Sequence, residues 1–82
     1  MSARPGWVIY GRRDCGLCEE MADAVLALSG GRVDPARVDV DDDPELARRY
    51  GADVPVLCLD DEVVCRHFVD PDRLGRALDA DT

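Results

Sequence analysis

Four short apolar segments of the chain have the pattern of β-strands. Residues 7–10 (Trp-Val-Ile-Tyr) are a continuous run of β-branched and aromatic side chains, which indicates a strand buried on both faces at the centre of a sheet. Residues 37–40 alternate between polar and apolar side chains, as in a half-buried edge strand. Residues 55–59 and 63–65 are separated by an acidic turn, a pattern typical of antiparallel neighbours.

The first of three predicted helices begins at Gly16 and ends before Gly30-Gly31. Its apolar residues recur at helical spacing, while acidic residues take the opposite side. Because an apolar face needs a surface to pack on, we expect this helix to lie on one face of the sheet. The side chains expected in that contact are Leu17, Met21, Val25 and Leu28.

The two later helices each follow an aspartate and a proline, Asp43-Pro44 and Asp70-Pro71. The aspartate is the preferred N-cap residue, and proline suits the first helical position. The earlier of these helices is two turns long and ends at Gly51. The later one is expected to fray over residues 79–82.

The element order is therefore βαβαββα. A helical crossover makes the first two strands parallel, whereas the hairpin adds an antiparallel pair to the same sheet. We expect an α/β fold in which one mixed four-stranded sheet has helices on both faces. At 82 residues, we expect a single domain spanning residues 1–82, and a monomer.

Charge and composition narrow the class of partner. The chain has 18 acidic residues against 10 basic ones, all of them arginine, and a net charge of −8. Nucleic acid and anionic membranes require positive potential, so we expect neither as a partner. The first apolar block is too short for a signal peptide or a membrane span, which favours a cytoplasmic location.

The candidate chemistry lies in Cys15-Gly16-Leu17-Cys18, between the central strand and the first helix. A Cys-x-x-Cys pair in this place predicts redox chemistry. Backbone N–H groups and the positive end of the helix dipole favour the Cys15 thiolate and are expected to lower its pKa below the free-thiol value of about 8.5. Cys18 lies one turn further along the same face, within reach of a mixed disulfide on Cys15. We therefore expect Cys15 to be the nucleophile and Cys18 the resolving thiol, with no bound cofactor.

The charges beside this pair oppose one another. Arg12 and Arg13 place positive charge just before Cys15, and Asp14 places a negative charge between them and the sulfur. Gly16 leaves the approach to Cys15 open. The sign of the electrostatic field at Cys15 therefore depends on where these side chains point.

The other metal-binding or reactive residue types give weaker signals. A zinc site would need two ligands besides Cys15 and Cys18, and the spacing of Cys58 and Cys65 is not that of a zinc knuckle. We expect Cys58 and Cys65 to be small buried side chains, and a disulfide between them depends on the strand register. His67, the only histidine, is expected at the surface or half-buried rather than as a general base.

An acidic run consisting of Asp39 and residues 41–43 precedes the second helix. It lacks the glycine and the distal glutamate of an EF-hand calcium loop. We expect a solvated loop that ends in the Asp43 helix cap.

The strand, the Cys-x-x-Cys pair, the helix and the later Val54-Pro55 together resemble the glutaredoxin-like class of the thioredoxin-fold superfamily, over residues 7–78. Cys-Gly-Leu-Cys-Glu-Glu is more similar to small uncharacterised bacterial glutaredoxin-like proteins than to glutaredoxins with Cys-Pro-Tyr-Cys. The resemblance implies a thioredoxin-like fold and thiol-disulfide oxidoreductase activity with Cys15 and Cys18 as the redox pair. It implies that Arg12 stands where glutaredoxins have a lysine that helps bind glutathione. It also implies a cis peptide bond before Pro55, with the Val54 backbone holding the substrate as an added strand.

The chain departs from glutaredoxins where they bind glutathione. Their Gly-Gly-Asp segment after the last strand is replaced by a stretch without glycines, residues 65–70, and Leu17 replaces the aromatic residue of the redox motif. We therefore expect protein or peptide disulfides as substrates, with glutathione or another thiol as electron donor. The alternatives are a non-catalytic binding module on the same fold and an iron–sulfur scaffold in which Cys15 of two chains shares a cluster. The residues expected to bind substrate are Arg12, Arg13, Val54 and Pro55.

Overall fold

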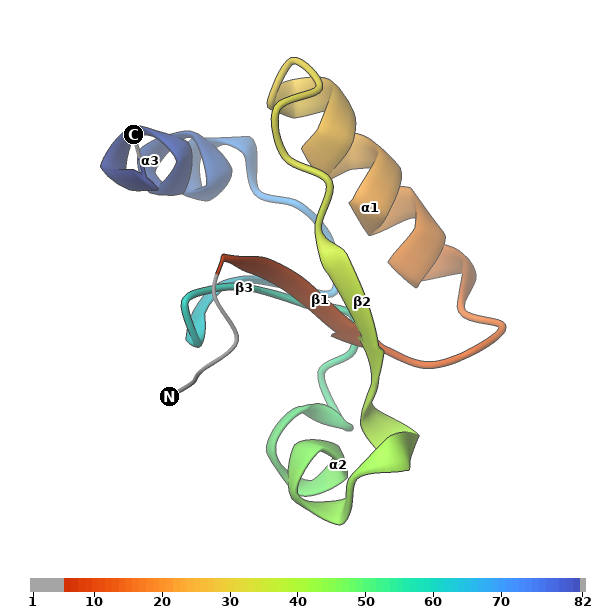
Figure 1. Cartoon of the computed structure of the whole chain (residues 1–82). Helices are drawn as coiled ribbons and strands as arrows, with labels where there is room; N and C mark the ends of the chain where they lie inside the picture. The colour runs from red at the N-terminus through yellow and green to blue at the C-terminus, as the bar shows by residue number, and fades with distance from the viewer. Residues whose placement is uncertain (1–5, 82) are drawn as a thin grey trace.

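A four-stranded mixed sheet separates the helices of the molecule into two layers (Figure 1). The computed structural model describes residues 6–81. Strand β1 pairs in parallel with β2 and antiparallel with β3, and β3 pairs antiparallel with β4, so β1 is internal as expected. The strands, in the sheet order β2-β1-β3-β4, are β2 (Ala36–Asp39), β1 (Trp7–Gly11), β3 (Val56–Leu59) and β4 (Glu62–Arg66).

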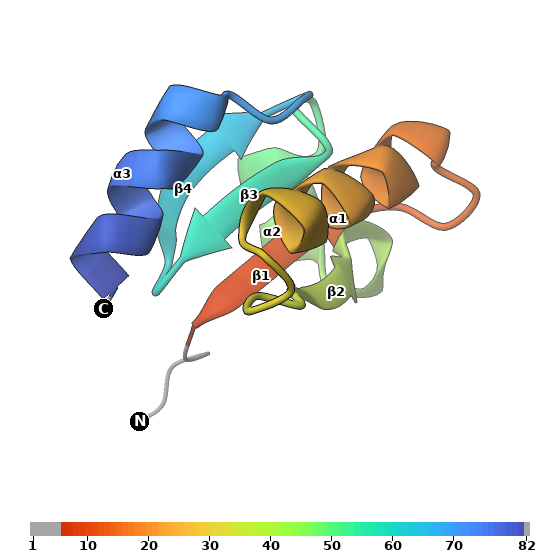
Figure 2. The same ribbon diagram turned by 90° about the horizontal axis from the view of Figure 1, so that it is seen from above.

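Helices lie on both faces of the sheet, which confirms the expected arrangement. Figures 1 and 2 show α1 (Gly16–Leu28) and α3 (Pro71–Asp81) on one side, and Figure 1 shows α2 (Pro44–Tyr50) on the other. A short 3-10 helix, η1 (Val40–Asp42), precedes α2, so the strand predicted over residues 37–40 ends one residue early. The cause is local, because the Asp39 side chain accepts a hydrogen bond from the Asp41 backbone N–H at 2.8 Å and turns the chain.

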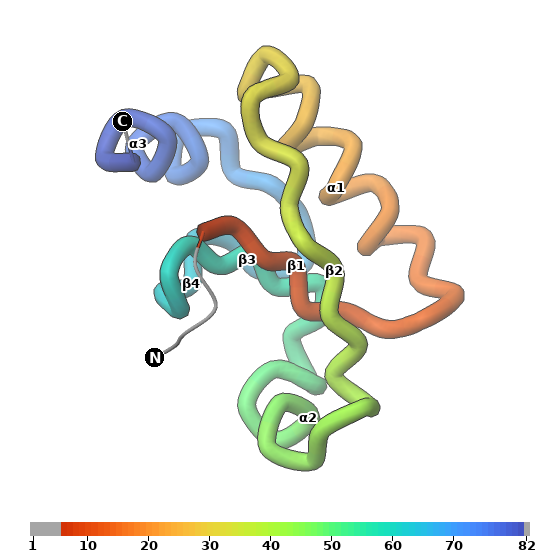
Figure 3. The backbone as a smooth tube through the Cα atoms, viewed as in Figure 1, coloured from red at the N-terminus to blue at the C-terminus, as the bar shows by residue number. Residues whose placement is uncertain are grey.

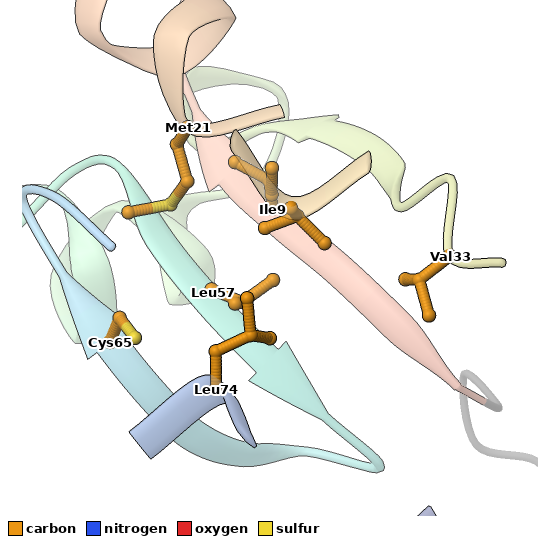
Figure 4. Packing of buried hydrophobic residues seen from close by; sticks show 7 residues of the cluster. Ile9, Met21, Val33, Leu57, Cys65 and Leu74 are labelled. Carbon is orange, nitrogen blue, oxygen red and sulfur yellow. The ribbon is translucent and has the colours of Figure 1, made fainter. Parts of the chain in front are cut away.

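Each face of the sheet carries its own apolar cluster. Side chains alternate along β1, so Ile9 faces α1 and α3, while Val8 and Tyr10 face α2. The cluster under α1 and α3, shown in Figure 4, comprises Ile9, Met21, Val25, Val33, Leu57, Cys65 and Leu74. The cluster under α2 comprises Val8, Tyr10, Val40, Tyr50, Val56 and Cys58.

The expected packing of α1 is right at its centre and wrong at its ends. Met21 and Val25 are buried, whereas Leu17 and Leu28 are each 53% exposed. The side of α1 that meets the sheet is a narrower line through Cys18, Met21 and Val25. The apolar stripe of this helix is therefore wider than the surface beneath it, and one edge of the stripe stays uncovered.

A β-bulge sets the orientation of the cysteines in the β3–β4 hairpin. Leu57 pairs with Cys65 but Cys58 pairs with Val63, so β4 has one extra residue between these pairs. Cys65 consequently faces the Ile9 side of the sheet and Cys58 the Tyr50 side. Both are buried free thiols, as expected, and the sheet between them prevents a disulfide.

The last helix, α3, is hydrogen-bonded to the first strand, β1. The indole N–H of Trp7 donates a hydrogen bond to Asp81 Oδ2 at 3.1 Å. Helix α3 continues through Asp81, so the prediction that the helix frays from residue 79 is wrong for residues 79–81. Thr82 lies outside the described residues. Within residues 6–81, no helix is both long and apolar enough to cross a membrane.

Candidate active site

Figure 3 shows the loop that leaves β1 and leads into α1. The two cysteines of the motif lie at the start of this helix. Cys15 is the N-cap of α1, with extended backbone angles, and its Sγ accepts a hydrogen bond from the Cys18 backbone N–H at 3.1 Å. A disulfide joins the two residues, whose Cα atoms are 5.2 Å apart. Cys15 is half-buried and Cys18 is 0% exposed. Of the two residues, Cys15 is therefore the one open to another molecule.

Cys18 packs against the last residue of β1. A Cβ atom at Gly11 would lie 2.5 Å from Cys18 Sγ, closer than non-bonded atoms come, so only glycine leaves room for the sulfur. At Gly16, by contrast, an added Cβ would meet nothing within 4 Å. The sequence analysis missed Gly11, although a glycine at the end of a buried strand is a signal for close approach by another group.

Both arginines before the motif contact the acidic run ahead of α2. Arg12 Nε lies 3.1 Å from Asp41 Oδ2, and Arg12 Nη1 donates to the Gly51 carbonyl at 2.8 Å. Arg13 Nε lies 3.3 Å from Asp39 Oδ2, although the Arg13 side chain is 80% exposed. These ion pairs partly compensate the charge that the sequence places beside Cys15. Cys15 also lies at the N-terminus of α1, and the positive end of a helix is an environment that favours negative charge.

The acidic run acts as helix caps and ion-pair partners. Asp39 caps η1, and Asp43 Oδ1 accepts a hydrogen bond from the Glu45 backbone N–H at 2.9 Å, which confirms the predicted cap of α2. Asp41 pairs with Arg12. Among residues 6–81, no group of three or more Cys, His, Asp or Glu side chains has the arrangement of a metal site.

The Val54-Pro55 peptide bond is cis. Tyr10 lies opposite Val56 in the β1–β3 ladder, so one further step in register places Pro55 beside Gly11, the residue that contacts Cys18. Among the described residues, neither the N–H nor the C=O of Val54 has a hydrogen-bond partner. The backbone beside the disulfide thus offers polar groups for an added strand.

The segment after β4 lies against this proline. The His67 backbone N–H donates to the Pro55 carbonyl at 2.7 Å, and His67 has a positive φ of 69°. The His67 side chain is 51% exposed, within the expected range, and its Nε2 lies 3.9 Å from Asp53 Oδ1. Phe68, the next residue, is 72% exposed.

The cysteine on the α2 face has a different environment. Burial raises the pKa of the Cys58 thiol, and a hydrogen bond with Tyr50 opposes part of that increase. Burial also raises the pKa of Tyr50, whose ring stacks on Tyr10 with centroids 4.4 Å apart. This thiol is therefore held neutral, on the face of the sheet opposite the Ile9 cluster.

The comparison with solved structures gives two relatives of nearly the same length and a longer thioredoxin. Protein Ne2328 from Nitrosomonas europaea, solved by NMR, is 32% identical with a TM-score of 0.79, over 94% of this chain and 93% of that one. Protein XcR50 from X. campestris, solved by X-ray diffraction, is 35% identical with a TM-score of 0.68, over 90% and 96%. Thioredoxin from Fasciola hepatica is 27% identical with a TM-score of 0.52, over 93% of this chain and 79% of that one. The fold is therefore thioredoxin-like, as the resemblance implied.

The comparison with curated proteins found no match. The family model described as "Glutaredoxin-like domain (DUF836)" matches residues 7–79, nearly the whole chain. That match, the two relatives above 30% identity and the Cys15–Cys18 pair at the start of α1 agree with one another. The chain therefore belongs to the glutaredoxin-like (DUF836) family of thioredoxin-fold proteins.

Proposed function

We propose that this protein is a thiol-disulfide oxidoreductase that reduces protein or peptide disulfides. One observation carries the proposal: Cys15 is a half-open N-cap cysteine whose sulfur accepts the Cys18 N–H, with Cys18 buried behind it and within bonding reach. A helix N-terminus stabilises a thiolate, which is the attacking species in disulfide exchange. The different exposure of the two cysteines supports Cys15 as nucleophile and Cys18 as resolving thiol.

The proposed reaction has two exchange steps. In the first, the Cys15 thiolate attacks one sulfur of the substrate disulfide, and the other substrate sulfur leaves as a thiolate that takes up a proton. In the second, Cys18 loses its proton and attacks Cys15 Sγ, which releases the second substrate thiol. The substrate gains two electrons and two protons, and the protein ends in the disulfide form seen in the structure. Glutathione or another thiol donor then returns both cysteines to thiols.

Substrate is proposed to dock on the backbone of Val54, beside Pro55. An extended peptide can pair with the N–H and C=O of Val54 whatever its own side chains are. Arg13, which is 80% exposed, can turn toward a substrate carboxylate, whereas Arg12 would first have to leave Asp41 and Gly51. We place the activity in the cytoplasm, where a dithiol is kept reduced.

Trapping tests the proposal. Reduced Cys18→Ser, mixed with a peptide disulfide, should accumulate a covalent adduct on Cys15 whose added mass equals one half of the substrate. The reduced parent should instead release both halves and finish with the Cys15–Cys18 disulfide. Reductase activity that survives in Cys15→Ser would contradict the proposal, and so would the absence of any adduct in Cys18→Ser.

Glutathione is tested separately, with a mixed disulfide of glutathione and with a peptide disulfide. We expect no strong preference for the glutathione substrate, because the residues after β4 contain no Gly-Gly segment. A strong preference that Arg12→Ala abolishes would instead indicate a standard glutaredoxin. A coloured dimer after anaerobic reconstitution with iron and sulfide would support an iron–sulfur scaffold.

A further inference from the structure

One edge of the apolar stripe of α1 is uncovered and forms a groove. Leu17, Met21, Ala24 and Leu28 follow one another at spacings of four, three and four, so they lie along one side of the helix. The opposite wall is the segment after β4, with Phe68 and Val69. These residues enclose about 230 Å³, and we call this space the α1 groove.

The α1 groove begins at the redox pair. Leu17, one of its lining residues, lies between Cys15 and Cys18 in the sequence. The other wall is fixed to the site through the hydrogen bond from the His67 N–H to the Pro55 carbonyl, 2.7 Å long. A substrate that pairs with Val54 and presents its disulfide to Cys15 therefore lies next to this groove.

The size of the groove favours side chains over a bound small molecule. Ligand pockets commonly measure about 300 to 1,000 Å³, which is more than this groove provides. The distance from Leu17 to Leu28 is about 16 Å at a rise of 1.5 Å per residue. An extended peptide covers that distance in about five residues.

The negative charge beside the α1 groove distinguishes between two possible occupants, a second copy of this chain and a segment of a substrate. Glu20 is exposed and lines the groove. If a second copy of this chain bound face to face, this carboxylate would meet the same carboxylate of the partner, and each chain carries a net charge of −8. A segment with a basic residue complements Glu20 instead.

We propose that the α1 groove selects disulfide substrates that carry a bulky apolar side chain within about five residues of the reacting cysteine, next to a basic residue. The inference rests on the proposed oxidoreductase function and narrows its substrate class. Glutathione has no apolar side chain and leaves the groove empty. Small apolar sites discriminate by about 10- to 200-fold, and because this groove is open to solvent we expect about tenfold.

The test compares three peptide disulfides that differ only beside the cysteine: one with Leu and Lys, one with Ala and Lys, and one with Leu and Glu. The reduced parent should show the highest kcat/KM with Leu and Lys, about tenfold above Ala and Lys. Phe68→Ala and Leu28→Ala should remove most of that preference. Leu26→Ala is the matched control, because Leu26 is exposed on the same helix but does not line the groove, and it should keep the preference.

Several outcomes would overturn the inference. Equal kcat/KM for the Leu and Ala peptides in the parent would do so, and so would a preference that persists in Phe68→Ala and Leu28→Ala. Equal loss in Leu26→Ala would show that the effect does not belong to the groove. A preference for Leu and Glu over Leu and Lys would contradict the proposed role of Glu20.

Two further measurements separate this inference from the proposed function. Bis(2-hydroxyethyl) disulfide has no side chain for the groove, so the parent and the groove variants should reduce it equally. Failure of the parent with this disulfide and with all three peptides would refute the oxidoreductase itself. Binding is then measured without turnover, by NMR titration of a cysteine-free Leu-Lys peptide into the Cys15→Ser/Cys18→Ser variant. Shifted amide signals in residues 24–28 and 67–69 are expected, and their absence would overturn the groove as a docking site.

Discussion

The start of α1 and the β3–β4 hairpin each hold two of the four cysteines, with opposite chemical results. On the helix, a spacing of three places Cys15 and Cys18 on one side, with Cα atoms 5.2 Å apart. On the hairpin, the alternation of side chains and the bulge send Cys58 and Cys65 to opposite faces of the sheet. The secondary structure that carries a pair of thiols therefore decides whether they can react with each other.

The start of α1 and the β3–β4 hairpin also differ in which protonation state of a cysteine they favour, the thiolate or the thiol. The N–H of Cys18 points at Cys15 Sγ, an arrangement that favours the thiolate. Around Cys58, burial favours the neutral thiol and raises the pKa. Four chemically identical side chains thus form one disulfide pair at a helix N-terminus and two buried free thiols.

The largest predicted contrast is in turnover. Cys15→Ser should reduce disulfide reductase activity to the uncatalysed background, because it removes the proposed nucleophile. The double variant Cys58→Ala/Cys65→Ala should keep nearly full activity, with a loss of stability of about 1 to 2 kcal/mol from the small cavities. Initial rates with a peptide disulfide measure both, and a large loss of activity in a folded Cys58→Ala/Cys65→Ala protein would break the comparison.

The rate of alkylation should differ between Cys15 and the two hairpin cysteines almost as strongly as turnover does. In the reduced native protein, iodoacetamide should modify Cys15 at least about a thousandfold faster than Cys58 or Cys65, whose modification needs local or global opening of the fold. Mass spectrometry of peptides from a time course measures the rates. Labelling of Cys58 in step with Cys15 would show that the hairpin opens far more readily than its burial indicates.

Glycine substitutions sharpen the contrast at the helix start. Gly11→Ala should lower the free energy of unfolding by about 1 to 3 kcal/mol, because its Cβ would collide with Cys18 Sγ. Gly16→Ala, where an added Cβ meets nothing within 4 Å, should change stability by less than about 1 kcal/mol. Urea unfolding of the oxidised proteins gives both values, and similar results for the two variants would show that Cys18 can move at no cost.

The smallest predicted effect is a change in the free energy of unfolding at alkaline pH. Folding raises the pKa values of Cys58 and Tyr50, so above the pKa of the unfolded thiol the unfolded chain holds fewer protons than the native protein. The free energy of unfolding should therefore be constant at neutral pH and fall as the pH rises through this range. Urea unfolding from pH 7 to pH 10 should show a shallower decline in Cys58→Ala than in the parent, and identical slopes would contradict the assigned burial effect.

Local signals in the sequence were sufficient for most of the fold and for the redox pair. The Asp-Pro starts of α2 and α3, the apolar run of β1 and the cysteine spacing each depend on neighbours within one or two turns. The errors came from longer-range contacts. Periodicity identified the apolar side of α1 but not the width of the surface beneath it, so Leu17 and Leu28 were expected to be buried.

Contacts between residues far apart in the sequence determine the features of the site that could not be predicted, namely the arginine positions and the cysteine orientations. The positions of Arg12 and Arg13 depend on carboxylates more than 20 residues away. The separation of Cys58 from Cys65 depends on a bulge that has no glycine or proline to mark it. Helix α3 reaches Asp81, whose side chain accepts a hydrogen bond from Trp7, 74 residues earlier in the sequence.

The hydrogen bond between Trp7 and Asp81 makes tryptophan fluorescence an intrinsic probe of helix α3. Trp7 is the only tryptophan, and its indole N–H is bonded to the final residue of α3, while the disulfide lies beyond the opposite end of β1. Indole emission therefore follows the docking of the C-terminal helix, at a site removed from the chemistry of Cys15. A stopped-flow trace of that emission during unfolding times the departure of α3 without any added label.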